Sequence, residues 1–183
     1  KTREGVEDNF EEGARSIARL RVSKRDAVIG VSASGITQFV RGSLTGARKK
    51  GARIIFVTCW PGTELQNYVD LIIAPAVGPE VIAGSTRLKA ATATKMVLNM
   101  LTTIAMIRIG KTYGNLMVDM QASNDKLRDR AERLVMTTCA LDRPAARTLL
   151  ASANGHVKVA ITMHKLGLDR EAARARLDAA GGV

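Results

Sequence analysis

Three short apolar runs in the first half of the chain predict strands of a parallel sheet. They are Ala27–Ser32, Arg53–Thr58 and Val69–Pro75. The first two are continuously apolar, which is typical of strands covered on both faces. A helical pattern over Thr37–Lys50 lies between them and ends at Gly51, a residue type that favours helix ends. Strand, helix and strand at this spacing predict a βαβ unit with a right-handed crossover.

After Pro79 the pattern predicts helices. One long helix fits Gly84–Ile109. Its polar residues recur at helical spacing and form one face: Ser85, Lys89, Thr92, Lys95, Asn99 and Thr103. The rest of this helix is apolar, so we expect it to be largely buried. A second helix over Asn124–Ala140 is rich in paired charges and should be more exposed.

The last forty residues predict a small bundle of three helices. Asp142, Asn154 and Asp169 are candidate N-caps, and a short Ala-rich helical pattern follows each of them. We therefore expect an α/β domain with a parallel sheet over residues 1–140, and a small helical module over residues 141–183.

Composition narrows the classes of partner. The net charge of +11 suggests nucleic acid, but the basic residues are scattered among acidic ones, and aromatic residues that could stack on bases make up only 3% of the chain. No apolar run approaches the roughly 20 residues that a membrane span needs. Cys59 and Cys139 have no second Cys or His at metal-ligand spacing. We expect free thiols and no metal, nucleic-acid or membrane partner.

The segment VSASGIT, Val31–Thr37, follows a predicted strand and precedes a helix. Ser32, Ser34 and Thr37 offer hydroxyl groups, and Gly35 allows the backbone to approach a ligand closely. Ligands of parallel sheets bind beyond the carboxyl ends of the strands, where helix N-termini attract anions. The segment is a candidate phosphate site, although a Ser/Gly turn at such a position is often only a turn.

The segment GPEVIAGSTRLKAATATK, Gly78–Lys95, concentrates further polar groups. Ser85 and Thr86 lie near the predicted helix N-terminus, with Arg87 and Lys89 beside them. Cations are unfavourable at that end of a helix, so the pair suggests a bound anion or a carboxylate partner; solvated side chains are the alternative. Glu80 could orient sugar hydroxyls or pair with Arg87.

Several segments together resemble the N-acetylmuramic acid 6-phosphate etherases and the related glucokinase regulatory proteins. These are VSASGIT, CWPGTEL, GPEVIAGSTRLKAATATK, LNMLTTIAMIRIGKTYGNLMVDMQASNDKL and the tail HVKVAITMHKLGLDREAARARL. The resemblance covers essentially the whole chain and favours the etherases over the much longer regulatory proteins. It implies an SIS (sugar isomerase) fold that is flavodoxin-like, with helices on both faces of the sheet, and a UBA-like C-terminal module.

The resemblance also implies a function: cleavage of the D-lactyl ether of N-acetylmuramic acid 6-phosphate, which gives N-acetylglucosamine 6-phosphate and D-lactate in cell-wall amino-sugar recycling. The family acts by elimination and water addition, without a metal or other cofactor, as a cytoplasmic enzyme and a homodimer. Its reaction needs a base and an acid. Five carboxylates lie close together near the start of the chain, and spacing alone distinguishes none of them: Glu4, Glu7, Asp8, Glu11 and Glu12. The motif GVED, Gly5–Asp8, matches the family's GAED-like motif and makes Glu7 the candidate catalytic residue.

The match is incomplete. The family's other acid lies upstream of the segments present here, so we expect a longer protein and an inactive chain when this part stands alone. Four residues depart from the family pattern and put details of the pocket in doubt: Ile36 for Arg, Gln38 for Pro, Trp60 for Asn and Ala91 for Gly. A non-catalytic sugar-phosphate-binding regulator is the alternative function. In either case the residues expected to hold the phosphosugar are Ser32, Ser34, Gly35, Thr37, Glu80, Ser85, Thr86, Arg87 and Lys89; the serines could equally contact the acetamido group or ring hydroxyls.

Overall fold

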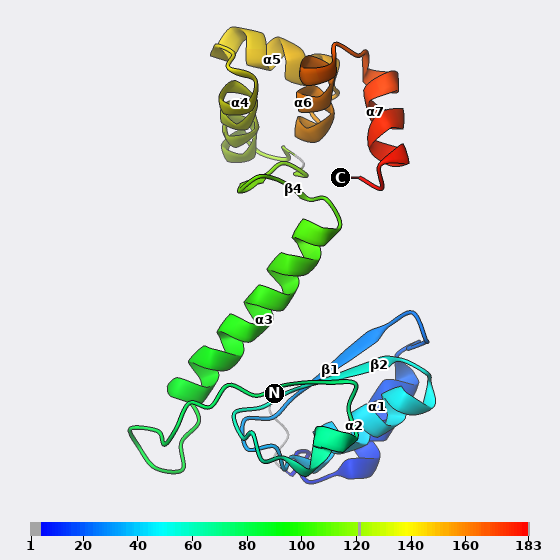
Figure 1. Cartoon of the computed structure of the whole chain (residues 1–183), viewed down its shortest axis with the longest axis vertical. Helices are drawn as coiled ribbons and strands as arrows, with labels where there is room; N and C mark the ends of the chain where they lie inside the picture. Colours follow the sequence, from blue (N-terminus) through cyan, green and yellow to red (C-terminus); the bar gives the residue numbers. More distant parts are fainter. Residues whose placement is uncertain (1–4, 121, 183) are drawn as a thin grey trace. The chain divides into compact units, whose positions relative to one another are not determined.

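The chain divides into two units, Lys1–Met100 and Leu101–Val183, in a computed structural model that describes residues 5–120 and 122–182 (Figure 1). The division lies near residue 100 rather than at the expected residue 140. Helix α4 (Asp125–Cys139) accounts for the difference, because its buried side chains belong to the same core as the C-terminal helices.

Three parallel strands form the sheet of the first unit. They are β1 (Ala27–Val31), β2 (Arg53–Val57) and β3 (Leu71–Ile73), in the order β1-β2-β3. Ile29 lies opposite Ile55, which in turn lies opposite Leu71. Helix α2 (Gln38–Lys49) connects β1 to β2. The predicted βαβ unit is therefore confirmed. β1 and β2 are each one residue shorter than the apolar run that predicted them, and β3 has three residues of the predicted seven.

Helices α1 (Phe10–Arg19) and α2 pack against each other and bury one side of the sheet (Figure 1). The core between them and the strands consists of Ile17, Leu44, Ala47, Ala52, Ile54, Phe56 and Leu65. The two helices approach closely because Gly42 has no side chain. A Cβ atom at Gly42 would lie 1.9 Å from the carbonyl oxygen of Phe10, far inside van der Waals contact.

The expectation that both faces of the strands are covered is wrong for β1 in the described part of the chain. Side chains alternate along a strand, and Val28 and Gly30 are the more buried pair. Ile29 and Val31 lie on the opposite face, where each remains 39% exposed. Continuous apolar sequence indicated burial on two sides, but α1 and α2 cover only one of them.

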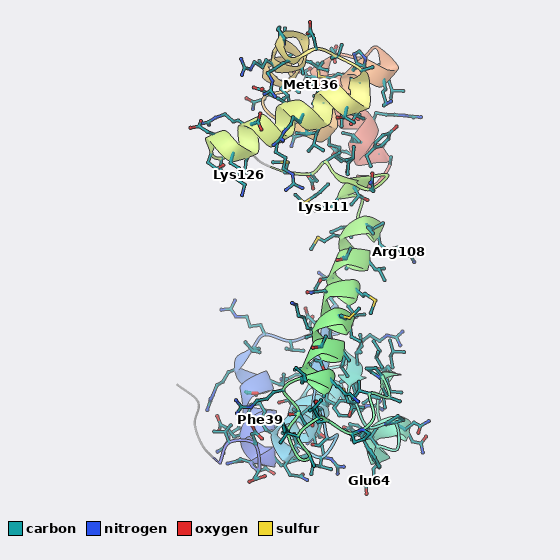
Figure 2. The ribbon with its side chains drawn as sticks, turned by 90° about the vertical axis from the view of Figure 1, so that its left-hand side faces the viewer. Phe39, Glu64, Arg108, Lys111, Lys126 and Met136 are labelled. Atoms are coloured by element: carbon teal, nitrogen blue, oxygen red, sulfur yellow. The ribbon has the colours of Figure 1, made fainter. Side chains whose placement is uncertain are left out.

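Helix α3 (Lys89–Arg108) begins later than predicted and is much less buried. Only Ala90 and Val97 in it are buried, and the side chains up to the labelled Arg108 project from the ribbon (Figure 2). Its exposed apolar residues are Met96, Met100, Ile104, Met106 and Ile107. By length and composition α3 could also cross a membrane, but such a test does not distinguish a span from a helix that packs on protein.

The second unit is a hairpin followed by four helices. Strands β4 (Thr112–Tyr113) and β5 (Leu116–Met117) pair antiparallel. Helices α4, α5 (Arg143–Ser152), α6 (Val157–Leu166) and α7 (Arg170–Ala179) follow. Their shared core is Val118, Met120, Ala131, Leu134, Val135, Cys139, Ala146, Leu150, Ala153, Val157, Ala160 and Ile161.

Two of the three predicted N-caps in this unit are confirmed. The Asp142 carboxylate accepts a 2.9 Å hydrogen bond from the Ala145 amide, and Asp169 accepts one of 2.8 Å from Ala172. The prediction for Asn154 is wrong. Asn154 has a left-handed φ of 54° and belongs to the turn before α6, whose N-cap is His156.

Candidate active site

The loop after β1 folds around the side chain of Ser32. This serine is buried, and its backbone amide continues the sheet by donating to the Val57 carbonyl over 3.0 Å. Its hydroxyl lies 2.8 Å from the Thr37 hydroxyl and accepts a 3.2 Å hydrogen bond from the Gly35 amide. These bonds close the loop across residues 32–37. The candidate phosphate site is thus a hydrogen-bonded turn that ends at the first residues of α2.

Hydroxyl groups from the end of β2 support this loop from behind. The Thr58 hydroxyl donates to the Ala33 carbonyl over 3.3 Å, and the Cys59 amide donates to the same oxygen over 3.0 Å. Gly35 has a φ of +79°, and a Cβ atom there would lie 3.3 Å from Oγ1 of Thr63. Sequence reasoning did not single out Thr58 and Thr63. The position of Thr58 directly after β2 could have indicated it, because the carboxyl ends of parallel strands share one edge. Thr63 lies six residues beyond the strand and carries no such signal.

A cavity of about 400 Å³ opens beside the loop. Its lining contains five of the predicted site residues, contributed by three separate segments: Glu7, Ser32, Ser34, Thr37 and Thr86. The remaining lining residues are Val6, Val31, Ala33, Phe39 and Val40. The cavity therefore combines one carboxylate with four hydroxyl groups at the carboxyl end of β1, where parallel sheets bind their ligands.

Glu7 is positioned by its backbone. Its carbonyl oxygen accepts a 2.9 Å hydrogen bond from the amide of Phe39, in the first turn of α2. On the other side, the Asn9 amide donates to the Val6 carbonyl over 3.1 Å, and Asn9 caps α1 through a 2.9 Å bond from the Glu12 amide. The Glu7 side chain is exposed, so its carboxylate is accessible to a molecule in the cavity.

Comparison with known proteins identifies the family. A sequence model described as the SIS domain matches residues 10–104, just over half of the chain. The chain belongs to the SIS domain family. The match spans the sheet, the loop around Ser32 and most of α3, so it includes the candidate site except for Glu7.

Several relatives are similar to this SIS domain protein beyond the domain itself. The N-acetylmuramic acid 6-phosphate etherase of Gloeobacter violaceus is 51% identical over 180 residues, which are 98% of this chain and 59% of the relative. The etherase of Rubrobacter xylanophilus is 51% identical over 181 residues, covering 99% of this chain and 60% of the relative. The etherase of Symbiobacterium thermophilum is 55% identical over 161 residues, which are 88% of this chain and 53% of the relative. The chain thus spans about three-fifths of the length of the curated relatives it matches.

In this SIS domain Glu80 caps a helix. Its two carboxylate oxygens each accept a 3.0 Å hydrogen bond, from the backbone amides of Lys89 and Ala90 at the start of α3. These bonds from Lys89 and Ala90 lower the pKa of Glu80 from its ordinary value, because they stabilise the charged form. The Lys89 ammonium group donates to the Pro79 carbonyl over 2.9 Å. The segment is therefore tied to the start of α3 through the Glu80 carboxylate and the Pro79 carbonyl.

Five predicted binding residues lie outside the cavity lining, and their part in binding stays a prediction: Gly35, Glu80, Ser85, Arg87 and Lys89. Gly35 is buried behind the loop and contributes its amide to Ser32. Among the described residues that line the cavity there is no Lys or Arg. A phosphate in this cavity would therefore meet hydroxyl groups and the N-terminus of α2 before it met a cation.

Neither cysteine is among the residues that line this cavity. Cys59 and Cys139 are free, and burial raises the pKa of the Cys139 thiol. Within residues 5–120 and 122–182 no group of three or more His, Cys, Asp or Glu side chains could hold a metal ion.

Proposed function

We propose that this chain is part of an N-acetylmuramic acid 6-phosphate etherase that acts in the cytoplasm on cell-wall amino sugars. The observation that carries the proposal is the cavity in which Glu7 shares a lining with four hydroxyl side chains. The similarity to relatives named N-acetylmuramic acid 6-phosphate etherase supports the identity of the substrate.

The phosphate is proposed to bind at the loop around Ser32. Ser32, Ser34 and Thr37 supply hydroxyl groups to the cavity lining. Thr37 is also the N-cap of α2, and the N-terminus of a helix carries a partial positive charge that attracts anions. Thr86 adds a hydroxyl from the segment before α3. Hydroxyl and amide donors of this kind can hold either a phosphate or the acetamido group and ring hydroxyls of the sugar, and we propose the phosphate for the loop.

Glu7 is proposed to act as the base of an elimination. Its carboxylate removes the proton from sugar carbon 2, the bond between carbon 3 and the lactyl oxygen breaks, and a second acid protonates that oxygen so that D-lactate leaves. Water then adds across the resulting double bond, with its hydroxyl on carbon 3 and a proton returned to carbon 2. The exposed position of the Glu7 side chain beside the phosphate loop supports this assignment.

The proposal places the second acid in a part of the protein upstream of these residues. The relatives are longer than this chain, which covers 59% of the Gloeobacter protein. We also propose a homodimer. The exposed apolar side chains of α3, such as Met100 and Ile104, support it, because burying them removes apolar surface from water.

The decisive experiment measures D-lactate release from N-acetylmuramic acid 6-phosphate. This chain is compared with a protein extended at its N-terminus to the length of the relatives. Lactate release by the longer protein, at a rate above about 1 s⁻¹, supports the etherase. Binding of the sugar phosphate by both proteins, with lactate released by neither, contradicts it and favours a non-catalytic regulator.

A further inference from the structure

The second unit contains a cavity of its own, distant in sequence from the residues of the candidate active site. Its volume is about 490 Å³, within the range of small-molecule sites. Its lining comes from β4, from α6 and from the C-terminal half of α7, which Figure 1 shows next to one another. We call it the cationic cavity, and its lining residues used below are Tyr113, Val118, Lys158, Ile161, Lys165 and Arg176.

The floor of the cationic cavity is apolar and buried. Val118 and Ile161 are 2% and 5% exposed and belong to the core of the unit. Leu166 and Leu177 add further apolar surface to the lining. An apolar body bound here would leave water without requiring the floor to rearrange, which is the usual basis of affinity in such pockets.

Positive charge surrounds this floor. Lys158 donates from its ammonium group to the carbonyl oxygens of Gly110 and Gly182, so it is fixed in the wall by neutral acceptors. Lys165 lies over the ring of Tyr113, 5.6 Å from its centre, and Arg176 of α7 belongs to the same lining.

These charges have no carboxylate partner in the described part of the chain. None of the ion pairs between described residues involves Lys158, Lys165 or Arg176. The lining of the cationic cavity contains no acidic residue. Asp119 and Asp178 line a neighbouring cavity, which shares Val118, Lys158 and Leu177 with the cationic cavity, and Asp119 pairs with Lys111.

We propose that the cationic cavity binds a small amphipathic anion, a molecule with a carboxylate or phosphate head and an apolar body. The head would lie between Lys165 and Arg176, which are exposed and can close on it. The body would rest on Val118 and Ile161. The concave shape favours a single small molecule over an extended polymer, and the near absence of aromatic residues other than Tyr113 disfavours stacked bases.

Methyl NMR of the full 183-residue chain, labelled at isoleucine, tests this proposal. The probes are octanoate and octyl phosphate at monomeric concentrations, with neutral 1-octanol for comparison. We expect saturable shifts of the Ile161 methyl signal with at least one anion, and binding of that anion about tenfold tighter than of octanol. The Ile104 and Ile107 methyl signals report separately on the exposed apolar face of α3.

Charge-reversal variants locate the anion. Lys165→Glu with Arg176→Glu should weaken binding of the anion by about tenfold or more. The matched control is Lys126→Glu with Arg130→Glu, which changes the net charge equally on α4, where Figure 2 labels Lys126, outside the cavity lining. Equal weakening in both double variants would overturn the proposal. So would octanol binding as tightly as the anions, or shifts confined to Ile104 and Ile107.

Discussion

The Phe39 amide donates a 2.9 Å hydrogen bond to the carbonyl oxygen of Glu7, and both residues line the same cavity. The bond joins the proposed base to the first turn of the helix that follows the phosphate loop. Gly42 reinforces the link one turn further along α2, where its bare Cα allows Phe10 to approach. Because the two segments are fastened to each other, the distance between the base and a bound phosphate should be a fixed property of the fold.

Replacing Glu7 by Gln should slow catalysis strongly without loss of folding. The substitution keeps the backbone bond to Phe39 and removes only the proton acceptor. General-base contributions are about 10²–10⁴ in rate, so kcat for D-lactate release by the longer protein should fall by at least about a hundredfold. KM should change little, because the hydroxyl groups that hold the phosphate remain.

Glu11→Gln is the control for Glu7→Gln. Glu11 lies in the first turn of α1 and outside the cavity lining, and its side chain is exposed. The two substitutions make the same change in charge four residues apart. Undiminished turnover in Glu7→Gln, or an equal loss in Glu11→Gln, would remove Glu7 from the mechanism.

Replacing Gly35 by Ala should weaken phosphosugar binding. Positive φ costs a non-glycine residue about 1–2 kcal/mol, and the new Cβ would also press on Oγ1 of Thr63 at 3.3 Å and of Thr58 at 3.4 Å. We expect the dissociation constant for the sugar phosphate to rise about tenfold or more, measured by calorimetry. Gly78→Ala is the control, because Gly78 has a φ of +67° but no atom within 4 Å of its Cβ position. It should lose stability without losing affinity.

Much of the sheet could be predicted from sequence, because its strands are short apolar runs and its first crossover helix is strongly patterned. The loop at Ser32 followed from the same pattern, since a strand that leads into a helix fixes where the loop lies. Thr58 could have been expected at this edge of the sheet, but its contact with the loop, and the position of Thr63 beside Gly35, could not be predicted from their own segment. Both depend on how the end of β2 meets the loop after β1, and no local pattern encodes that contact.

The predicted burial of α3 was wrong. Apolar residues on most sides of a helix indicate that something covers it, but the pattern does not say what. Met100 and Ile104 are exposed in this chain, although the apolar pattern of the helix predicted that they would be buried. The N-cap prediction for Asn154 was wrong for a different reason. Asparagine is favoured both as an N-cap and in a left-handed turn, and here Asn154 adopts the left-handed turn that precedes the N-cap His156.

Replacing Gly42 by Ala should destabilise the first unit despite the better helix propensity of alanine. Alanine gains about 1 kcal/mol in a helix, but its Cβ would lie 1.9 Å from the Phe10 carbonyl oxygen, so α1 must move. We expect a net loss of about 1–3 kcal/mol, measured by urea unfolding through the fluorescence of Trp60. Gly46→Ala is the matched comparison, because a Cβ atom at Gly46 would lie 3.2 Å from its nearest neighbour, the Ala14 carbonyl oxygen. It should be nearly neutral; equal losses would show that helix contact at Gly42 is unimportant.

Glu80 should act as a positioning residue for the segment that carries Thr86. Glu80→Ala removes both acceptors from the amides of Lys89 and Ala90, whereas Glu80→Gln keeps one of them. Hydrogen exchange at these two amides should therefore accelerate most in the alanine variant and less in the glutamine variant. In the longer protein KM should rise more than kcat falls, because Thr86 is displaced while Glu7 is not.

The matched control for Glu80 is Glu64→Gln, which removes an exposed ion pair with Arg41 and no cap. It should leave exchange at Ala90 unchanged. The lowered pKa of Glu80 means that its cap is fully present above the ordinary carboxyl pKa of about 4.3. The cap should be lost as the pH falls through the lowered value. Exchange at Ala90 that shows no such acid dependence beyond the intrinsic rate would contradict the capping role.

The carboxylates of α4 should make the second unit sensitive to acid. Arg143 lies 2.8 Å from Asp129 and 2.6 Å from Glu132, and Arg147 also lies 2.6 Å from Glu132. The hydrogen bond from Arg143 lowers the pKa of Asp129, and that from Arg147 lowers the pKa of Glu132. Their stabilisation is therefore present above the unfolded pKa values of about 3.9 and 4.3. It should be lost as the pH falls through the lowered folded values.

Urea unfolding of the second unit, followed by the buried Ile161 methyl signal at several pH values, measures this dependence. The double variant Asp129→Asn with Glu132→Gln should be less stable than the parent at pH 7 and should converge with it as the pH falls through the lowered folded pKa values of the two carboxylates. Asp125→Asn is the control, since Asp125 pairs only with Arg128 at the exposed start of α4 among the described ion pairs. Exposed ion pairs contribute little to stability, so the Asp125→Asn variant should be as stable as the parent at every pH. A parent and a double variant that lose stability in parallel on acidification would show that the acid-sensitive groups lie elsewhere, because the variant has no charge left to titrate at these two positions.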